Sequence, residues 1–201
     1  MNASVIPKQV EFFFDVGSPA SYLAWTQLPG LCESTAAVLV YRPMLLGGVF
    51  QATGNASPVT VPAKGRYVFG DLARFARRYG VSLRVNPHFP INTLVLMRAA
   101  AGVQTHAPER LQAFLQAVFK AMWVDGLNVG EAAVASQVLA DAGFDPAQVF
   151  AWAGEADVKA TLRATTDEAV ARGAFGAPTM FVNGEMFFGQ DRLDFVREAL
   201  G

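Results

Sequence analysis

The residues best suited to chemistry lie near the N-terminus, in the stretch DVGSPASYLAW over residues 15–25. Ser18 follows a run of strand-forming residues and precedes Pro19, so we expect it to begin a helix. Free backbone N–H groups and the helix dipole stabilise negative charge there by about 0.3–1 kcal/mol. The Ser18 hydroxyl could donate to a bound anion, such as a thiolate that another molecule supplies. It could equally do no more than cap the helix, and the sequence leaves both roles open.

Two further motifs, FGAPT and GQDR, flank the last predicted strands at residues 175–179 and 189–192. If the Ala177–Pro178 bond is cis, the Ala177 backbone is free to pair with an extended peptide, although a trans proline that opens a strand is the commoner case. Gln190 or Asp191 could cap the following helix, and the Asp191 carboxylate could instead bind a ligand ammonium. An N-cap and a ligand contact do not exclude each other.

Several kinds of chemistry are excluded by what these motifs lack. Ser18 has no histidine near it in the sequence pattern, so a serine nucleophile is not expected. His88 and His106 lie in or near predicted loops without metal-ligand spacing, so we predict no metal. Disulfide exchange needs a thiolate that the serines of the SPAS tetrapeptide cannot supply. The single cysteine, Cys32, is expected to be a small buried hydrophobe, and a reducing cytoplasm is the simplest compartment.

Composition gives the broad class of protein. The chain has 201 residues, of which 52% are hydrophobic and 16% charged, so a sizeable core is expected. A formal net charge of −1 gives no basic excess for nucleic acid or for an anionic membrane surface. The first residues lack the features of a secretory signal, and no apolar run is long enough to cross a bilayer. We therefore expect a partner that is a small molecule.

The elements that must position these motifs follow the order β-α-β, a helical block, then α-β-β-α. Residues 9–16 and 37–45 are rich in strand formers, and the runs TMFV and EMFF flank Asn183-Gly184, a strong hairpin signal. This order predicts an α/β, thioredoxin-like fold with a large all-helical insertion. The predicted thioredoxin-like part comprises residues 1–46 and 174–201 with a helix at about 155–173. The predicted insertion spans 63–154 and is linked by a loop over 47–62.

Five segments together resemble the 2-hydroxychromene-2-carboxylate isomerases, a glutathione-dependent family grouped with kappa-class glutathione transferases and DsbA-type disulfide oxidases. The resemblance runs over nearly the whole chain, and the combination of motifs is specific although each alone is weak. The segments are FFFDVGSPASYLA, RPMLLGGVFQATGN, PAKGRYVFGDLARFARRYGV, HFPINTLVLMRAA and GAPTMFVNGEMFFGQDRL.

The resemblance implies a role for each matching residue. Ser18 would face the sulfur of glutathione, while Ala177 and the cis-proline Pro178 would hold its cysteinyl portion. Asp191, with Gln190, would hold the γ-glutamyl end. Asn55, in the predicted loop, would also contact glutathione. Lys64 would contact either the glycyl end of glutathione or the substrate carboxylate.

The reaction implied is the interconversion of 2-hydroxychromene-2-carboxylate and trans-o-hydroxybenzylidenepyruvate in naphthalene-type hydrocarbon breakdown. A glutathione thiolate would add to the unsaturated substrate, allow rotation and ring opening, and then be expelled. Four aromatic residues would suit a bicyclic aromatic acid, with core packing as the alternative for each: Phe50, Tyr67, Phe89 and Trp123. A kappa-like transferase that conjugates electrophiles and a redox-inactive binding module remain alternatives, and relatives in the group are often homodimers.

Overall fold

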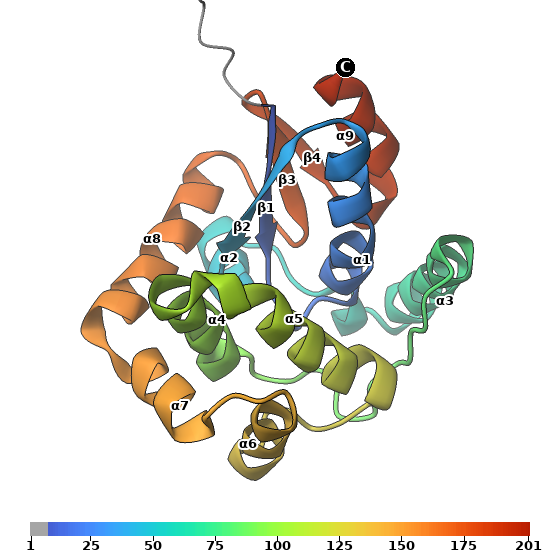
Figure 1. Cartoon of the computed structure of the whole chain (residues 1–201). Coiled ribbons are helices and arrows are strands. Elements are labelled where there is room, and N and C mark those ends of the chain that lie inside the picture. The colour runs from blue at the N-terminus through green and yellow to red at the C-terminus, as the bar shows by residue number, and fades with distance from the viewer. Residues whose placement is uncertain (1–7) are drawn as a thin grey trace, which may run out of the picture.

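The computed structural model describes residues 8–201 and shows a small sheet surrounded by helices (Figure 1). The strands are β1 (Gln9–Phe14), β2 (Val38–Pro43), β3 (Thr179–Val182) and β4 (Glu185–Phe188). The helices are α1 (Pro19–Ser34), α2 (Leu46–Thr53), α3 (Pro62–Tyr79), α4 (Leu94–His106), α5 (Leu111–Lys120), α6 (Ala132–Asp141), α7 (Pro146–Gly154), α8 (Ala156–Ala171) and α9 (Leu193–Leu200). The prediction about a secretory signal lies partly outside the described residues.

The sheet has the order β2-β1-β3-β4, with β1 and β2 parallel and the other pairs antiparallel. Phe12 lies opposite both Tyr41 and Met180, which places β1 between its two partners. Asn183 and Gly184 both have positive φ, 51° and 84°, as a tight two-residue hairpin turn requires. The predicted βαβ and αββα units are confirmed, and so is the thioredoxin-like fold class.

The second half of β1 consists of three phenylalanines because this part of the strand is buried on both faces of the sheet. Phe12 and Phe14 pack into the main core with helices α1, α4 and α5, whereas Phe13 packs on the opposite face with Phe181. All three rings are fully buried. Successive side chains of a strand point to opposite faces, so a strand covered on both faces needs a continuous apolar run. In Figure 1, α1 and α9 lie on one side of the sheet and α8 lies on the other.

The prediction of a loop over residues 47–62 is wrong for part of its length. Residues 46–53 form α2, and Pro58–Thr60 form a 3-10 turn, η1. Adjacent glycines in the first turn of α2 lower its intrinsic helix propensity, so the local sequence pattern did not indicate a helix there. Tertiary hydrogen bonds compensate, since the Leu45 and Leu46 amides donate to Thr166 Oγ1 and to Asp15 Oδ2. The predicted division into a thioredoxin-like part and a helical insertion stays a prediction.

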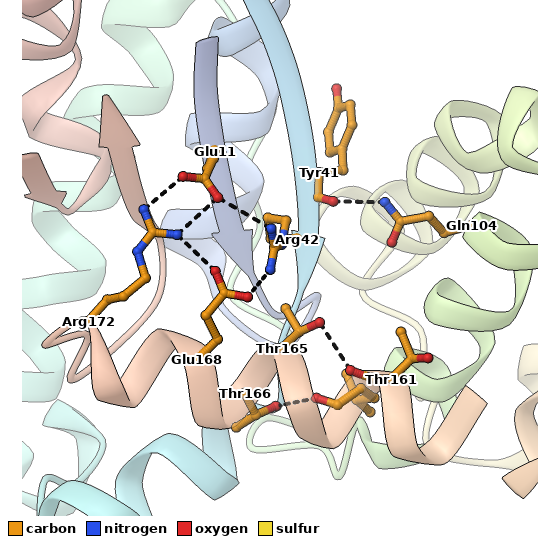
Figure 2. Close-up of polar contacts among 10 residues, drawn as sticks. Glu11, Tyr41, Arg42, Gln104, Thr161, Thr165, Thr166, Glu168 and Arg172 are labelled. Atoms are coloured by element: carbon orange, nitrogen blue, oxygen red, sulfur yellow. Dashed lines mark hydrogen bonds and ion pairs between the residues drawn. The ribbon is translucent and has the colours of Figure 1, made fainter. Parts of the chain in front are cut away.

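Four charged side chains connect α8 to the sheet (Figure 2). The Arg172 guanidinium contacts Glu11 at 2.7 Å and Glu168 at 2.9 Å, and Arg42 contacts the same two carboxylates. Both guanidinium groups also lie over the Phe13 ring, at 5.0 and 5.5 Å from its centroid. Hydrogen bonding to Arg172, with the positive charges of both arginines, lowers the pKa of Glu11 although partial burial opposes the shift. This cluster covers the smaller of the two cores.

Candidate active site

Ser18 is the N-cap of α1 and joins the start of that helix to the segment before β3. Its Oγ accepts a hydrogen bond from the Ser21 amide at 3.1 Å and donates one to the Ala177 carbonyl at 3.0 Å. The residue is only 5% exposed. The capping role left open by the sequence is therefore present in the structure, and the hydroxyl proton points toward the second predicted motif. Its contact with a ligand stays a prediction.

The second motif lies between the start of α1 and the turn after β4. The Ala177–Pro178 peptide bond is cis, as the resemblance implies. The Pro178 carbonyl accepts a hydrogen bond from the Gly189 amide at 3.0 Å, so the 177–178 and 189–191 segments are adjacent. A Cβ on Gly176 would lie 2.8 Å from the Phe188 ring, so a larger residue there would force that ring to move.

The third motif forms a tight turn that presents the Asp191 carboxylate. Gly189 has φ of 97°, and a Cβ there would lie 2.5 Å from Asp191 Oδ1. Asp191 Oδ2 contacts the Arg192 guanidinium at 2.7 Å. Tyr79 of α3 donates its hydroxyl proton to the Gln190 carbonyl at 2.8 Å and so connects the turn to that helix. The predicted capping of the last helix by Gln190 or Asp191 is wrong, because Arg192 occupies the N-cap of α9 without a side-chain cap.

Asn55 and Lys64 come from the segment between α2 and the start of α3. Asn55 Nδ2 donates to the Phe175 carbonyl at 2.8 Å, and its Oδ1 accepts from the Ala56 amide at 2.8 Å. This amide therefore links the end of α2 to the segment before the cis-proline. Lys64 lies in the first turn of α3, is exposed, and forms no ion pair with the part of the chain that the structure describes.

A cavity of about 470 Å³, here called the α1 cavity, brings these motifs together. Its volume falls within the usual range for small-molecule sites. The predicted site residues that line it are Ser18, Phe50, Asn55, Lys64, Tyr67, Phe89, Ala177, Gln190 and Asp191. Pro178 adjoins the cavity through Ala177 without lining it. Three aromatic residues absent from the predicted set, Phe69, Phe175 and Phe188, also line it, and the Phe175 and Phe188 ring centroids are 4.5 Å apart.

The structure does not place Trp123 in the α1 cavity. Its side chain is fully buried, and its indole Nε1 donates to the Val16 carbonyl at 2.8 Å. A buried indole needs one partner for its N–H and otherwise fills the core, and a helical sequence pattern cannot distinguish that role from a ligand contact. The predicted substrate contact by Trp123 is therefore wrong. The residue instead holds the loop that leads to Ser18.

Asp15 is a buried acid next to the cavity loop to which sequence reasoning assigned no role. It is 2% exposed and accepts three hydrogen bonds, from the Gly17 amide at 2.8 Å, Thr93 Oγ1 at 2.8 Å and the Leu46 amide at 2.9 Å. Burial raises the pKa of this carboxyl, and the three donors oppose the rise. An acidic residue directly after a buried strand was the available signal. Asp15 joins the Ser18 loop to the beginnings of α2 and α4.

The remaining groups that could compete for chemistry lie elsewhere. Cys32 is buried in α1 away from the cavity, and desolvation raises the pKa of its thiol to about 11, so it is protonated at neutral pH. Over residues 8–201, no group of three or more His, Cys, Asp and Glu side chains is arranged to hold a metal ion. None of the helices in that range combines the length and the apolar character needed to cross a membrane.

Comparisons with known proteins agree with this geometry. The model of the DSBA-like thioredoxin domain matches residues 9–201. The 2-hydroxychromene-2-carboxylate isomerase of Sphingobium xenophagum is 31% identical over 195 residues, covering 96% of this chain and 98% of that protein. Glutathione S-transferase kappa 1 of Rattus norvegicus is 30% identical over 207 residues, covering 97% and 92%.

Solved structures give the same picture. A structure of 2-hydroxychromene-2-carboxylate isomerase superposes with a TM-score of 0.84 at 28% identity, covering 96% of this chain and 94% of the other. A probable DsbA oxidoreductase from Streptomyces coelicolor gives a TM-score of 0.71 at 19% identity, with 96% and 88% coverage, and shows the shared fold alone.

Proposed function

Since this chain belongs to the family of DSBA-like thioredoxin domains, we propose that it is a glutathione-dependent isomerase. The proposed reaction interconverts 2-hydroxychromene-2-carboxylate and trans-o-hydroxybenzylidenepyruvate, as a step in the breakdown of naphthalene-type hydrocarbons. The observation that carries the proposal is the α1 cavity, where a serine caps the start of a helix and shares the lining with separate cationic and anionic side chains. The similarity to isomerases over nearly the whole chain supports it.

The residues of the α1 cavity fit glutathione. This tripeptide carries an ammonium group at its γ-glutamyl end and a carboxylate at each end, and the cavity offers Asp191 and Lys64 as charges of opposite sign. Arg192, paired with Asp191, adds a cation beside the same turn. Between these ends, the Ala177 backbone precedes a cis-proline and can pair with an extended peptide. We assign the γ-glutamyl end to Gln190 and Asp191 and the glycyl end to the side of Asn55 and Lys64.

Glutathione would supply a thiol that, as thiolate, adds reversibly to the unsaturated substrate and is not consumed. The chain's own task is then to stabilise negative charge at the start of α1. Ser18 is the only side-chain hydroxyl at that helix cap in the cavity, and it can redirect its proton from the neutral Ala177 carbonyl to an anion. The N-terminal amides of α1 contribute in the same direction. Because Ser21 is fully buried and outside the cavity, we assign it no role.

The aromatic lining defines where the organic substrate would lie. Tyr67 is 67% exposed at the cavity, and Phe50 and Phe89 line it from α2 and from the segment before α4. Phe175 and Phe188 provide a second aromatic wall. A flat bicyclic acid can stack against such rings. Lys64 would bind the substrate carboxylate if the glycyl end of glutathione does not occupy this lysine.

A kappa-like transferase is the second candidate, because kappa-class relatives are 26–30% identical over nearly the whole chain. Kappa-class proteins are glutathione transferases by name, so the same cavity would serve both reactions. The two differ in whether glutathione is consumed. A homodimer and a cytoplasmic location stay predictions for either function.

The test follows the ultraviolet spectrum of 2-hydroxychromene-2-carboxylate with extensively dialysed protein, with and without added glutathione. We expect isomerisation that requires glutathione while the free thiol concentration, measured in parallel, stays constant. Loss of free thiol in proportion to substrate would establish the transferase instead. No turnover with glutathione present, or turnover that is independent of it, would refute the proposal.

A further inference from the structure

A second cavity, larger than the first, lies between α2, α4 and α8. Its volume is about 840 Å³, and we call it the α8 groove. Both α2 and α4 pack against α8, and in Figure 1 α2 and α8 lie on the side of the sheet away from α9. The lining residues are Leu45, Gly48, Gln51, Ala52, Leu94, Arg98, Lys159, Ala160, Leu162, Arg163, Thr166, Asp167 and Val170. None of them lines the α1 cavity.

The charged residues of the groove are unbalanced. Arg98 of α4 faces it with Lys159 and Arg163 of α8, against one carboxylate, that of Asp167. The whole chain has 16 basic and 17 acidic residues, so three cations to one acid is a local excess. None of the three cations forms an ion pair with any acidic residue in the part of the chain that the structure describes.

The three cations of the groove lie close together in sequence or in space. Lys159 and Arg163 are four residues apart on α8, and like charges at that spacing repel each other. Arg98 is half-buried, where an unpaired cation is less well solvated than on an open surface. Elsewhere on the same helix, Glu168 pairs with two arginines, which shows that α8 can place acids beside cations (Figure 2). With Asp167 as its one carboxylate, the groove keeps a net positive charge among the residues that the structure describes.

Apart from Gln51 and Thr166, the rest of the lining is apolar. Leu45, Leu94, Leu162 and Val170 line the groove, and small residues of α2 and α8, Gly48, Ala52 and Ala160, leave space there. We propose that the α8 groove binds an organic anion that carries two or more negative charges on an apolar body. The charged groups would contact Arg98, Lys159 and Arg163, and the apolar body would pack against the leucines. This inference does not rest on the proposed function.

A ligand bound in the groove would affect the shape of the α1 cavity through α2. This helix presents Phe50 to the α1 cavity and Gly48, Gln51 and Ala52 to the groove, so it forms a wall of both. Its first two amides are held by Thr166, which lines the groove, and by Asp15, which holds the Ser18 loop. A ligand that packs against the groove side of α2 therefore touches an element that also shapes the site of chemistry.

The test uses 4,4′-dianilino-1,1′-binaphthyl-5,5′-disulfonate, an apolar dye with two sulfonates, and the full chain. We expect saturable binding of one dye per chain, seen as increased fluorescence, with an affinity that falls as salt is added. The double variant Arg98→Gln/Arg163→Gln should weaken binding at least about tenfold, as expected when two charge-assisted contacts are lost. Ala160→Trp, which fills the groove at an exposed position, should weaken it independently of charge.

The matched control is Arg66→Gln/Arg77→Gln, which removes the same charge from exposed positions of α3 outside both cavities. It should leave the affinity unchanged, and thermal melting should confirm that every variant is folded. Equal affinity of the Arg98→Gln/Arg163→Gln variant and the wild type would overturn the proposal. So would loss of binding in Lys64→Gln alone, because the dye would then occupy the α1 cavity, and so would the absence of saturable binding.

Discussion

The two serines of the SPAS tetrapeptide should respond differently to removal of their hydroxyl groups. Ser18 Oγ has two partners, the Ser21 amide and the Ala177 carbonyl, whereas Ser21 Oγ is buried without a partner among residues 8–201. Replacing an N-cap serine by alanine costs about 0.5–2 kcal/mol. In a chain of this size 1 kcal/mol lowers the melting temperature by about 2–4 °C. Ser18→Ala should therefore melt a few degrees lower, and Ser21→Ala should melt at the wild-type temperature or above, because it removes an unsatisfied polar group.

The effect of Ser18→Ala on the reaction can be bounded from the same contacts. Removing one donor to a developing anion costs up to about 1000-fold in rate. Here the hydroxyl must first give up a neutral carbonyl acceptor, Ala177 O, and charge-assisted hydrogen bonds are roughly twice as strong as neutral ones. About half of the gross stabilisation remains, so we expect kcat to fall by about 10- to 100-fold, or about 1.4–2.7 kcal/mol.

The assay is glutathione-dependent isomerisation followed by ultraviolet absorbance, with Ser21→Ala as the matched control in the same helix turn. An unchanged kcat in Ser18→Ala, together with a lowered melting temperature, would show that the residue only caps α1. Equal losses of kcat in both variants would also refute the reasoning. The cause would then be disturbed packing at the helix start and not the hydroxyl that faces the cavity.

Three further predictions concern the surrounding structure. Glu11→Gln should lower the free energy of unfolding at pH 7 by about 1–3 kcal/mol, measured by urea titration. The folded pKa of Glu11 lies below its ordinary 4.5, so the difference between the variant and the wild type should persist above about pH 4.5. It should vanish as the pH falls through the folded pKa, which urea titrations at several pH values would show. Gly189→Ala should weaken glutathione binding in calorimetry about tenfold or more, because its Cβ would displace Asp191, while Gly184→Ala, with similar φ and open space, should cost stability alone. Tyr79→Phe should raise KM for glutathione about three- to tenfold with kcat unchanged, and equal changes in both constants would contradict a purely positioning role.

Local sequence patterns predicted much of the fold and of the α1 cavity. Three local patterns each predict one kind of structure: a buried strand for the FFF run, a hairpin turn for Asn183-Gly184, and a helix start for the proline after Ser18. All three are present in the structure. The site motifs converge because they lie at the ends of elements whose order already fixes the fold. Ser18 and Asp191 line one cavity for this reason, while their contacts with a ligand stay predictions.

The errors arise where a residue's role depends on distant partners. Trp123 has the same helical spacing whether it faces a cavity or the core, and only the Val16 carbonyl decides between them. The α2 helix has two glycines in its first turn, and its start is stabilised by Asp15 and Thr166, which are 31 and 121 residues away from their partners in sequence. No local pattern contains such hydrogen bonds.

The contacts of the loop before Ser18 have a consequence for protein engineering. Its Val16 carbonyl is bound by Trp123, its Val16 amide contacts the Met97 sulfur, and its Asp15 carboxylate is bound by Thr93. All three partners come from the helical residues between β2 and β3, not from the sheet. A chimera that grafts the sheet and α1 onto a foreign set of helices would lose every one of these contacts. Modular exchange at this boundary should thus yield a folded sheet with a misplaced Ser18, unless residues equivalent to Met97, Thr93 and Trp123 are transplanted with it.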